Sequence, residues 1–417
     1  MLFNITAMKQ RSLQRFLRYV MIDTQADENS PSYPSTRKQF DLANLLVEEL
    51  KQLGLNDARV NEHCYVIATL NESTSTPQPV IGFLAHLDTS TEVSGTHVKP
   101  KVIENYQGGD IIVNSEKAIV ISESENRELS RCIGHTLVTA DGSSLLGADD
   151  KAGIAAIISA VEYLVEHPDI PHGKIKIAFT PDEEIGKGVE FFDITDFGAD
   201  FAYTIDGGFT GELNNETFSA HAAFIEIKGR DMHPGTAKDR MVNSVRAMAE
   251  IITRLPRNMS PETTHDHEPY IHPQTIEGGV GASRLKILLR DFTDEGLMRQ
   301  RKILERIIDE VRQLFPNARF TLTVTPTYRN MLPELLKHPD VTGRLEDAVR
   351  KAGMEPLWQP IRGGTDGSVL TARGLPTPNI FTGGCNSHSL TEWQSIDALV
   401  KAVEVIVNIA LGRLSTH

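Results

Sequence analysis

Apolar residues recur at helical spacing in the first part of the chain. The first stripe, which predicts an amphipathic helix, consists of Leu13, Phe16, Leu17 and Val20. A second helix is expected from about Thr36, because Thr36 and Gln39 have the spacing of a capping box. A stripe of leucines follows and ends before Gly54, which stands where a C-terminal cap belongs.

Continuous apolar runs then alternate with helical stretches. Such runs are typical of strands that are buried on both faces of a parallel sheet. The predicted strands are 64–70, 80–85, 174–180 and 201–205, with a helix at 152–167. Strands separated by helices indicate an α/β domain, with a mixed, mostly parallel sheet flanked by helices. In these sheets, ligands bind beyond the carboxyl ends of the strands.

The pattern changes after about residue 220. The expected elements are strands at 222–229, 283–292 and 319–327 and helices at 242–255 and 297–315, with a loop at 256–281 that is rich in Pro, Thr, His and Gly. This order predicts an inserted two-layer α+β domain at 218–329. The larger domain then consists of 1–217 and 330–417, and its last helix is expected at 395–414.

Charge and composition narrow the functional classes. Lys and Arg total 42 and Asp and Glu total 56, which makes the net charge −14. An acidic surface argues against nucleic acid or an anionic membrane as a partner. No run of 18 apolar residues occurs, and the N-terminus lacks a secretory pattern, so a cytoplasmic protein is expected. The scattered cysteines, Cys64, Cys132 and Cys385, fit a reducing compartment.

Polar clusters follow the predicted apolar strands. They are His86-Leu87-Asp88, Gly147–Gly153, Thr180–Gly186, Thr204–Gly208 and Asn386-Ser387-His388. Each alone has an ordinary explanation, such as a loop, a helix cap or a solvated charge run. Together they supply nitrogen and oxygen ligands without thiolates, which suits a catalytic zinc or manganese pair. Of two neighbouring glutamates, one can bind metal while the other takes a proton from water.

Several sequence blocks carry a family resemblance. They are HLDTS, LLGADDKAGIA, IPHGKIKIAFTPDEEIGKG, YTIDGG, HPGTAK, RGGTDG and FTGGCNSH, and they run in order across nearly the whole chain. With them the sequence resembles the aminoacylase and carboxypeptidase-type family of di-zinc metallopeptidases. Within that family it is most similar to the aminopeptidases that remove the N-terminal residue from short peptides, above all tripeptides. The resemblance implies two zinc ions per chain, for which manganese or cobalt can substitute.

The resemblance also implies roles for individual residues. The residues implied to hold the two metals are His86, Asp149, Glu184, Asp206 and His388. Asp149 would be shared, with His86 and Asp206 completing one site and Glu184 and His388 the other. Glu183 would be the general base. Asp88 would be the acid behind His86 that the family also counts as catalytic.

Four further residues are similar to positions that contact substrate. His233, in HPGTAK, would hold the substrate carbonyl or stabilise the oxyanion. Asn243, Arg290 and Arg362 resemble other substrate contacts. For Arg290, an ion pair with a nearby aspartate, Asp291 or Asp294, explains the residue equally well. The inserted domain would then act as a lid over a short peptide, and a homodimer is left open.

The last motif departs from the family pattern. The tripeptide aminopeptidases usually continue as Asn-Tyr-His-Gly-x-His-Glu, whereas this chain has Asn-Ser-His-Ser-Leu-Thr-Glu at 386–392. The change bears on substrate preference rather than on metal binding. Two alternatives share the same zinc site: a carboxypeptidase or N-acyl-amino-acid deacylase, and a metal-binding homologue without catalysis. The intact Glu183 argues against the second.

Overall fold

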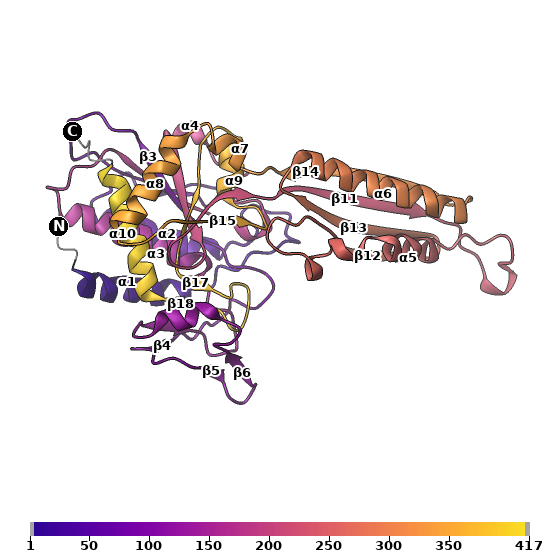
Figure 1. The fold of residues 1–417 in the computed structure, drawn as a ribbon, viewed down its shortest axis with the longest axis horizontal. Coiled ribbons are helices and arrows are strands. Elements are labelled where there is room, and N and C mark those ends of the chain that lie inside the picture. The colour runs from indigo at the N-terminus through magenta and orange to yellow at the C-terminus, as the bar shows by residue number, and fades with distance from the viewer. Residues whose placement is uncertain (1–3, 413–417) are drawn as a thin grey trace. The chain divides into compact units, whose positions relative to one another are not determined.

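The computed structural model describes residues 4–412, and the chain divides into two compact units (Figure 1). The first unit runs to Asn215 and includes Met331–Gln359 and the chain from Thr365 on. The second consists of Glu216–Asn330 and Pro360–Gly364. The sequence analysis assigned this last segment to the larger domain. It belongs to the second unit because the Phe218 N–H donates to the Ile361 carbonyl at 3.1 Å.

The first unit is built on an eight-stranded sheet. In spatial order its strands are β1 (Arg59–Val60), β2 (Val66–Leu70), β8 (Ile175–Thr180), β3 (Ile81–His86), β9 (Phe201–Gly207), β16 (Asn379–Phe381), β10 (Glu212–Thr217) and β15 (Leu357–Ile361). The central four, from β8 to β16, run parallel. β1 pairs antiparallel with β2, β2 with β8, and β10 with β16. The α/β fold is confirmed, with a mixed sheet whose four central strands run parallel.

Helices cover both faces of this sheet. One layer contains α1 (Ile5–Val20), α2 (Gln39–Gln52), α3 (Ala148–Glu166), α8 (Pro339–Lys351) and α10 (Ile396–Leu411). The short helices α4 (Ile194–Phe197) and α9 (Asp366–Ala372) supply Phe197 and Leu370 to a second apolar cluster. Neighbouring residues of β3 pack against opposite layers, because successive side chains of a strand point to opposite faces of the sheet. Phe83 packs in the first cluster and Leu84 in the second.

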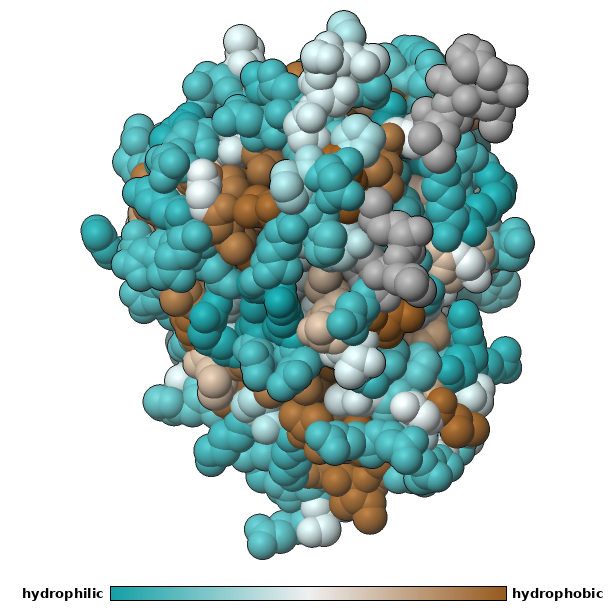
Figure 2. Space-filling model, turned by 90° about the vertical axis from the view of Figure 1, so that its left-hand side faces the viewer, coloured by the Kyte–Doolittle hydropathy of each residue, from teal (hydrophilic) through white to brown (hydrophobic). Residues whose placement is uncertain are grey.

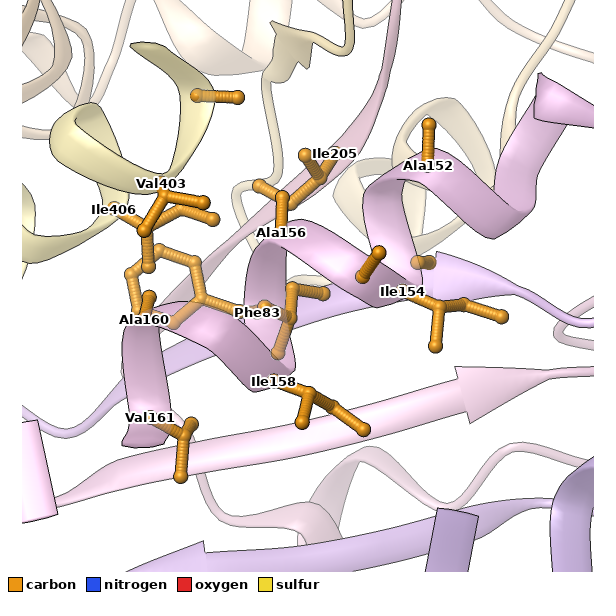
Figure 3. Close-up of a cluster of buried hydrophobic side chains, with 14 of the residues drawn as sticks. Phe83, Ala152, Ile154, Ala156, Ile158, Ala160, Val161, Ile205, Val403 and Ile406 are labelled. Atoms are coloured by element: carbon orange, nitrogen blue, oxygen red, sulfur yellow. The ribbon is translucent and has the colours of Figure 1, made fainter. Parts of the chain in front are cut away.

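Small side chains let α3 pack tightly in the core. Figure 3 shows Ala156 and Ala160 of α3 near Phe83 of β3, with Val403 and Ile406 of α10 beside them. Gly153 brings the start of this helix closest to the sheet, because an added Cβ would lie 2.0 Å from the Ile205 carbonyl oxygen of β9. This close approach brings the first turn of α3 beside the strand that carries Asp206.

Two details of the predicted helices need correction. α2 begins at Gln39, and its N-cap Lys38 makes no side-chain capping bond. The predicted capping box is wrong because the Thr36 hydroxyl donates to the Gln25 carbonyl at 2.8 Å. The cap at Gly54 is confirmed by its positive φ of 96°. The last helix, α10, ends at Leu411, and positions 413–414 of the prediction lie outside the described residues.

The second unit is a four-stranded antiparallel sheet with two helices. Its strand order is β12 (Tyr270–Gly279), β13 (Ala282–Asp291), β11 (Ser219–Lys228) and β14 (Arg319–Tyr328). The helices α5 (Ser244–Arg254) and α6 (Asp294–Leu314) share one apolar cluster with the sheet. The predicted loop at 256–281 is wrong where β12 forms. β12 lies at the edge, is largely exposed and shifts register after Pro273, so it lacks the apolar pattern of a buried strand.

A smaller sheet in the first unit was not foreseen. Its order is β17 (Gly384–Cys385), β18 (Trp393–Ser395), β7 (Leu137–Thr139) and β4 (Lys101–Ile103), and a hairpin, β5 (Ile111–Asn114) with β6 (Ile119–Ile121), lies outside it. The strands are short, and they join segments far apart in the chain. Pairing of β7 with β18 links the segment before α3 to the segment after β17.

The face of the protein that is drawn in Figure 2 is mostly polar. Hydrophilic side chains dominate the face in Figure 2, with smaller hydrophobic patches between them. Among residues 4–412, no helix combines the length and the apolar character that crossing a bilayer requires.

Replacing Gly153 with alanine tests the close approach of α3 to β9. Alanine in a helix is normally favoured over glycine by about 1 kcal/mol. Here the added methyl would collide with the backbone, so we expect Gly153→Ala to lower the free energy of unfolding by about 1–3 kcal/mol. Urea unfolding of the metal-free protein measures this change. Gly279→Ala is the control, since an added Cβ there meets nothing within 4 Å. A gain in stability at Gly153 would contradict the packing argument.

Candidate metal centre

The central parallel strands bring the predicted polar clusters to one edge of the sheet. His86 ends β3, and Asp206 lies near the end of β9. Glu183 and Glu184 form a 3-10 turn after β8, and His388 lies in the loop beyond β16 and β17. These strands are neighbours, so their carboxyl ends meet. Side chains from distant parts of the sequence therefore converge where an α/β sheet usually binds its ligand.

Asp149 lies between the two histidines. Its Oδ1 is 2.9 Å from His86 Nε2, and its Oδ2 is 3.5 Å from His388 Nε2. His86 Nε2 is also 3.6 Å from Asp206 Oδ1, and His388 Nε2 is 2.9 Å from Glu184 Oε2. Each carboxylate oxygen of Asp149 thus faces a different histidine. By these distances, His86 lies near Asp149 and Asp206, and His388 lies near Asp149 and Glu184.

Asp150 is a further acid at the centre that the sequence analysis did not propose as a ligand. Two groups could hold a metal ion by the mutual distances of their ligand atoms: His86, Asp149 and Glu184, and His86, Asp150 and Asp206. Asp150 is fully buried, and its oxygens accept from the N–H groups of Gly153 and His86, both at 3.1 Å. Because both oxygens are engaged, Asp149 is the better candidate for a shared ligand.

The residues at the centre fit a divalent cation. Both groups offer only nitrogen and oxygen ligands, which suits a catalytic zinc site and not a thiolate structural one. Glu184 Oε1 is buried and has no hydrogen-bond partner among the described residues. A buried carboxylate oxygen without a partner is costly, and a cation would remove that cost.

The electrostatics also favour a cation. Burial, followed by the charge of Asp149, raises the pKa of Glu184 to about 8, and burial raises the pKa of Asp206 to about 6. Burial would lower the pKa of His388, but bonds to Asp149 and Glu184 outweigh it and raise that pKa to about 11. Protonation of these groups relieves crowded negative charge. A bound cation would do the same and displace the protons.

Asp88 supports two parts of the centre. Its backbone carbonyl oxygen lies 3.1 Å from His86 Nδ1, and its Oδ1 lies 3.4 Å from the same nitrogen. Its carboxylate also accepts from the backbone N–H groups of Glu183 at 3.0 Å and Glu184 at 3.1 Å. Asp88 is fully buried, so these bonds fix the turn that carries both glutamates. Nothing in the sequence motif indicates this second contact.

Glu183 is held by a neighbouring buried acid. Its Oε1 accepts from the Asp366 N–H at 3.3 Å, and the Asp366 carboxylate accepts from the Thr180 hydroxyl at 2.7 Å. Burial, followed by the charge of Asp206, raises the pKa of Glu183 well above its usual value. Asp366 lies in the RGGTDG block, in which the sequence analysis proposed a role only for Arg362.

Asp182 and Glu392 are two more buried acids, to which the sequence analysis assigned no role. Asp182 has a positive φ of 56° and accepts from Gln39 Nε2 at 2.7 Å, which ties the glutamate turn to α2. Glu392 accepts three backbone N–H groups from the segment that leads into Asp149. These buried roles are difficult to predict from the sequence, because a single acidic residue is usually exposed at the surface.

The altered motif around His388 forms its own hydrogen-bonded loop. The Ser389 hydroxyl donates to the Asn386 carbonyl at 2.7 Å and lies 2.9 Å from the Thr391 hydroxyl. Asn386 Nδ2 lies 3.3 Å from the Thr391 carbonyl oxygen. Two residues that depart from the family pattern therefore bond within the loop that carries His388.

The four candidate substrate residues belong to the second unit. His233 caps the 3-10 turn Pro234–Thr236 and accepts from the Gly235 N–H at 3.1 Å. Asn243 caps α5 by accepting from the Arg246 N–H at 3.2 Å. Each of these hydrogen bonds is made to a backbone N–H two or three residues further along the chain. The other polar side-chain atoms of His233 and Asn243 are therefore available to other groups.

The two arginines differ in how far they are engaged. Arg290 donates to the Leu289 carbonyl at 3.1 Å and lies over the Tyr328 ring. Within residues 4–412, no ion pair joins it to either nearby aspartate. Arg362 donates to the Asp266 and Glu268 carbonyls at 2.7 and 2.8 Å and to the Thr264 hydroxyl at 2.8 Å. Most of its donors therefore hold one loop.

Comparison with known proteins agrees with this geometry. The family model described as peptidase family M20/M25/M40 matches residues 138–412. A protein of Geobacillus thermodenitrificans named peptidase T is 48% identical, over 96% of this chain and 98% of its own length.

Two solved structures have the same fold. One is aminopeptidase PepT from Bacillus cereus, with a TM-score of 0.73 and 20% identity over 97% of this chain and 98% of that one. The other is a tripeptidase from Staphylococcus aureus, with a TM-score of 0.73 and 21% identity over 96% and 97% of the two chains. From the family match and the 48% identical relative, we conclude that the chain belongs to peptidase family M20/M25/M40.

Proposed function

We propose that this protein is a di-zinc aminopeptidase that removes the N-terminal residue from short peptides, above all tripeptides. The main support is the Asp149 carboxylate, whose oxygens face His86 at 2.9 Å and His388 at 3.5 Å. A relative at 48% identity is named peptidase T, and neighbours of the same fold are described as an aminopeptidase and a tripeptidase. The arrangement of the candidate ligands supports a di-metal hydrolase, and the relatives favour an aminopeptidase among such enzymes.

Five side chains would hold the two ions. Asp149 would be shared, and the remaining ligands would be His86 with Asp206 and His388 with Glu184. Three ionised carboxylates balance most of the charge of two divalent ions and leave the centre electrophilic. When bound, the metals would lower the pKa of water and polarise a carbonyl oxygen.

Glu183 would move the proton. It is next to a proposed ligand in sequence, and its Oε1 accepts from the Asp366 N–H, which leaves Oε2 to face the reaction. Its ionised carboxylate would take a proton from the attacking water and pass that proton to the leaving amine. Asp88 would keep Glu183 in place through the bond to its backbone N–H.

The second unit would complete the substrate site. His233 is proposed to hold the substrate carbonyl or the oxyanion, and Asn243 and Arg290 to contact the peptide. Arg362 makes three bonds to residues 264–268, so its proposed contribution is partly to shape that loop. The unit is proposed to act as a lid that excludes water from the reaction.

Peptides with blocked ends test the choice of bond. With zinc-loaded protein, we expect a free tripeptide to be cleaved at its first peptide bond and its N-acetylated form to resist cleavage, because an aminopeptidase recognises the free amine. The products are identified by mass spectrometry, and a C-amidated tripeptide serves as the comparison. Cleavage of the N-acetylated peptide but not the amidated one would indicate a carboxypeptidase or deacylase. No cleavage at full zinc content would indicate a metal-binding homologue.

The paired glutamates test the mechanism. We expect Glu183→Gln to keep its zinc and lose about 10² to 10⁴-fold in kcat, since a positioned base contributes about that much. Glu184→Gln should instead lose zinc, because Glu184 is the proposed ligand. Glu190→Gln, at an exposed position of the same segment, is the control and should behave like the parent. Zinc content and kcat are measured on the same preparations. Near-parental kcat for Glu183→Gln at full zinc content would place the base elsewhere.

A further inference from the structure

Glu392 is a buried acid whose carboxylate is fully used by backbone donors. It is 2% exposed. Its Oε2 accepts from the N–H groups of Leu146 at 2.8 Å and Gly147 at 2.7 Å, and its Oε1 accepts from the Asp149 N–H at 3.1 Å. Because both oxygens are engaged, Glu392 is a poor candidate for a metal ligand. Its contacts lie instead on the backbone that presents one.

The segment that Glu392 holds is not helical, although it opens α3. Gly147 has a φ of 79°, and Asp149 has φ −83° and ψ 104°. In this conformation three N–H groups converge on one point and form a concave site for an anion. Helical bonding does not satisfy these donors, and a buried N–H without a partner is destabilising. The Glu392 carboxylate therefore stabilises the conformation that turns Asp149 toward the histidines.

Glu392 also belongs to the loop that carries His388. The Glu392 N–H donates to the Ser389 carbonyl at 3.3 Å, which closes the loop begun by Asn386. One side chain thus joins the loop of Asp149 to the loop of His388. The distance between Asp149 Oδ2 and His388 Nε2, 3.5 Å, depends on how these two loops are held together.

We propose that Glu392 is a positioning residue that orients the Asp149 carboxylate toward His388 and thereby sets the affinity for the metal ion these residues share. The inference rests on the proposed di-metal function. Glu392 acts through Asp149 and touches neither substrate nor metal. Asp88 makes the same kind of contact at this centre, because its carboxylate accepts hydrogen bonds from the backbone N–H groups of Glu183 and Glu184.

Binding of Co²⁺ to the metal-free protein tests this role. Glu392→Gln keeps the size of the side chain but replaces one acceptor oxygen with a donor, so one of the three N–H groups loses its partner. We expect the more weakly bound of the two Co²⁺ ions to bind about 10–100-fold less tightly than it does in the parent protein. A loss of this size is typical when the hydrogen-bond partner of a metal ligand is changed. The visible absorption of bound Co²⁺, which reports ligand geometry, should change as well. Glu392→Asp keeps both acceptors and should recover part of the affinity.

Glu49→Gln is the matched control. Glu49 is a largely buried acid of the same unit, and it accepts from Arg15 at 2.7 Å and Tyr19 at 2.6 Å, away from the metal residues. This variant should lose stability in urea yet bind both Co²⁺ ions within about threefold of the parent.

Two results would overturn the proposal. One is Glu392→Gln binding both ions with parental affinity and spectrum, and the other is Glu392→Asp binding no better than Glu392→Gln. Fewer than two Co²⁺ ions in the parent would instead contradict the proposed function itself.

Discussion

Crowded negative charge at the carboxyl edge of the central sheet is the constraint on which the candidate site depends. Four neighbouring parallel strands end at this edge: His86 is the last residue of β3, Asp206 lies near the end of β9, and the two glutamates follow β8. Asp149 enters from the start of α3 and faces both histidines. So many carboxylates in a buried place are unfavourable: burial first, and the charge of Asp149 after it, raise the pKa values of Glu184 and Asp206. Divalent cations relieve the repulsion without removing the charge that a hydrolytic reaction uses.

Backbone amides hold this unfavourable arrangement in place. Asp88 accepts from the glutamate turn, and Glu392 accepts from the Asp149 segment. In each case a buried carboxylate satisfies backbone N–H groups that helices and strands leave unpaired. The segments at the centre are therefore positioned by side chains from distant parts of the chain. Substitutions at these supporting acids should act on metal binding before they act on the fold.

The sequence allowed much of this centre to be predicted, for a physical reason. Buried parallel strands have continuous apolar runs, and ligands that follow them must meet at one edge, so His86, Glu184 and Asp206 could be placed together. β12 was missed because an exposed edge strand has no apolar pattern. The roles of Glu392 and Asp366 were missed because their partners lie far away in the chain: backbone N–H groups for Glu392, and the side chains of Glu183 and Thr180 for Asp366. Motif spacing carries no record of such contacts.

Anomalous diffraction at the zinc edge, from crystals of zinc-loaded protein, tests the central claim most directly. The account predicts two peaks, one on each side of the Asp149 carboxylate, with His86 and Asp206 next to one and Glu184 and His388 next to the other. A single peak, or two peaks that do not share Asp149, would contradict it.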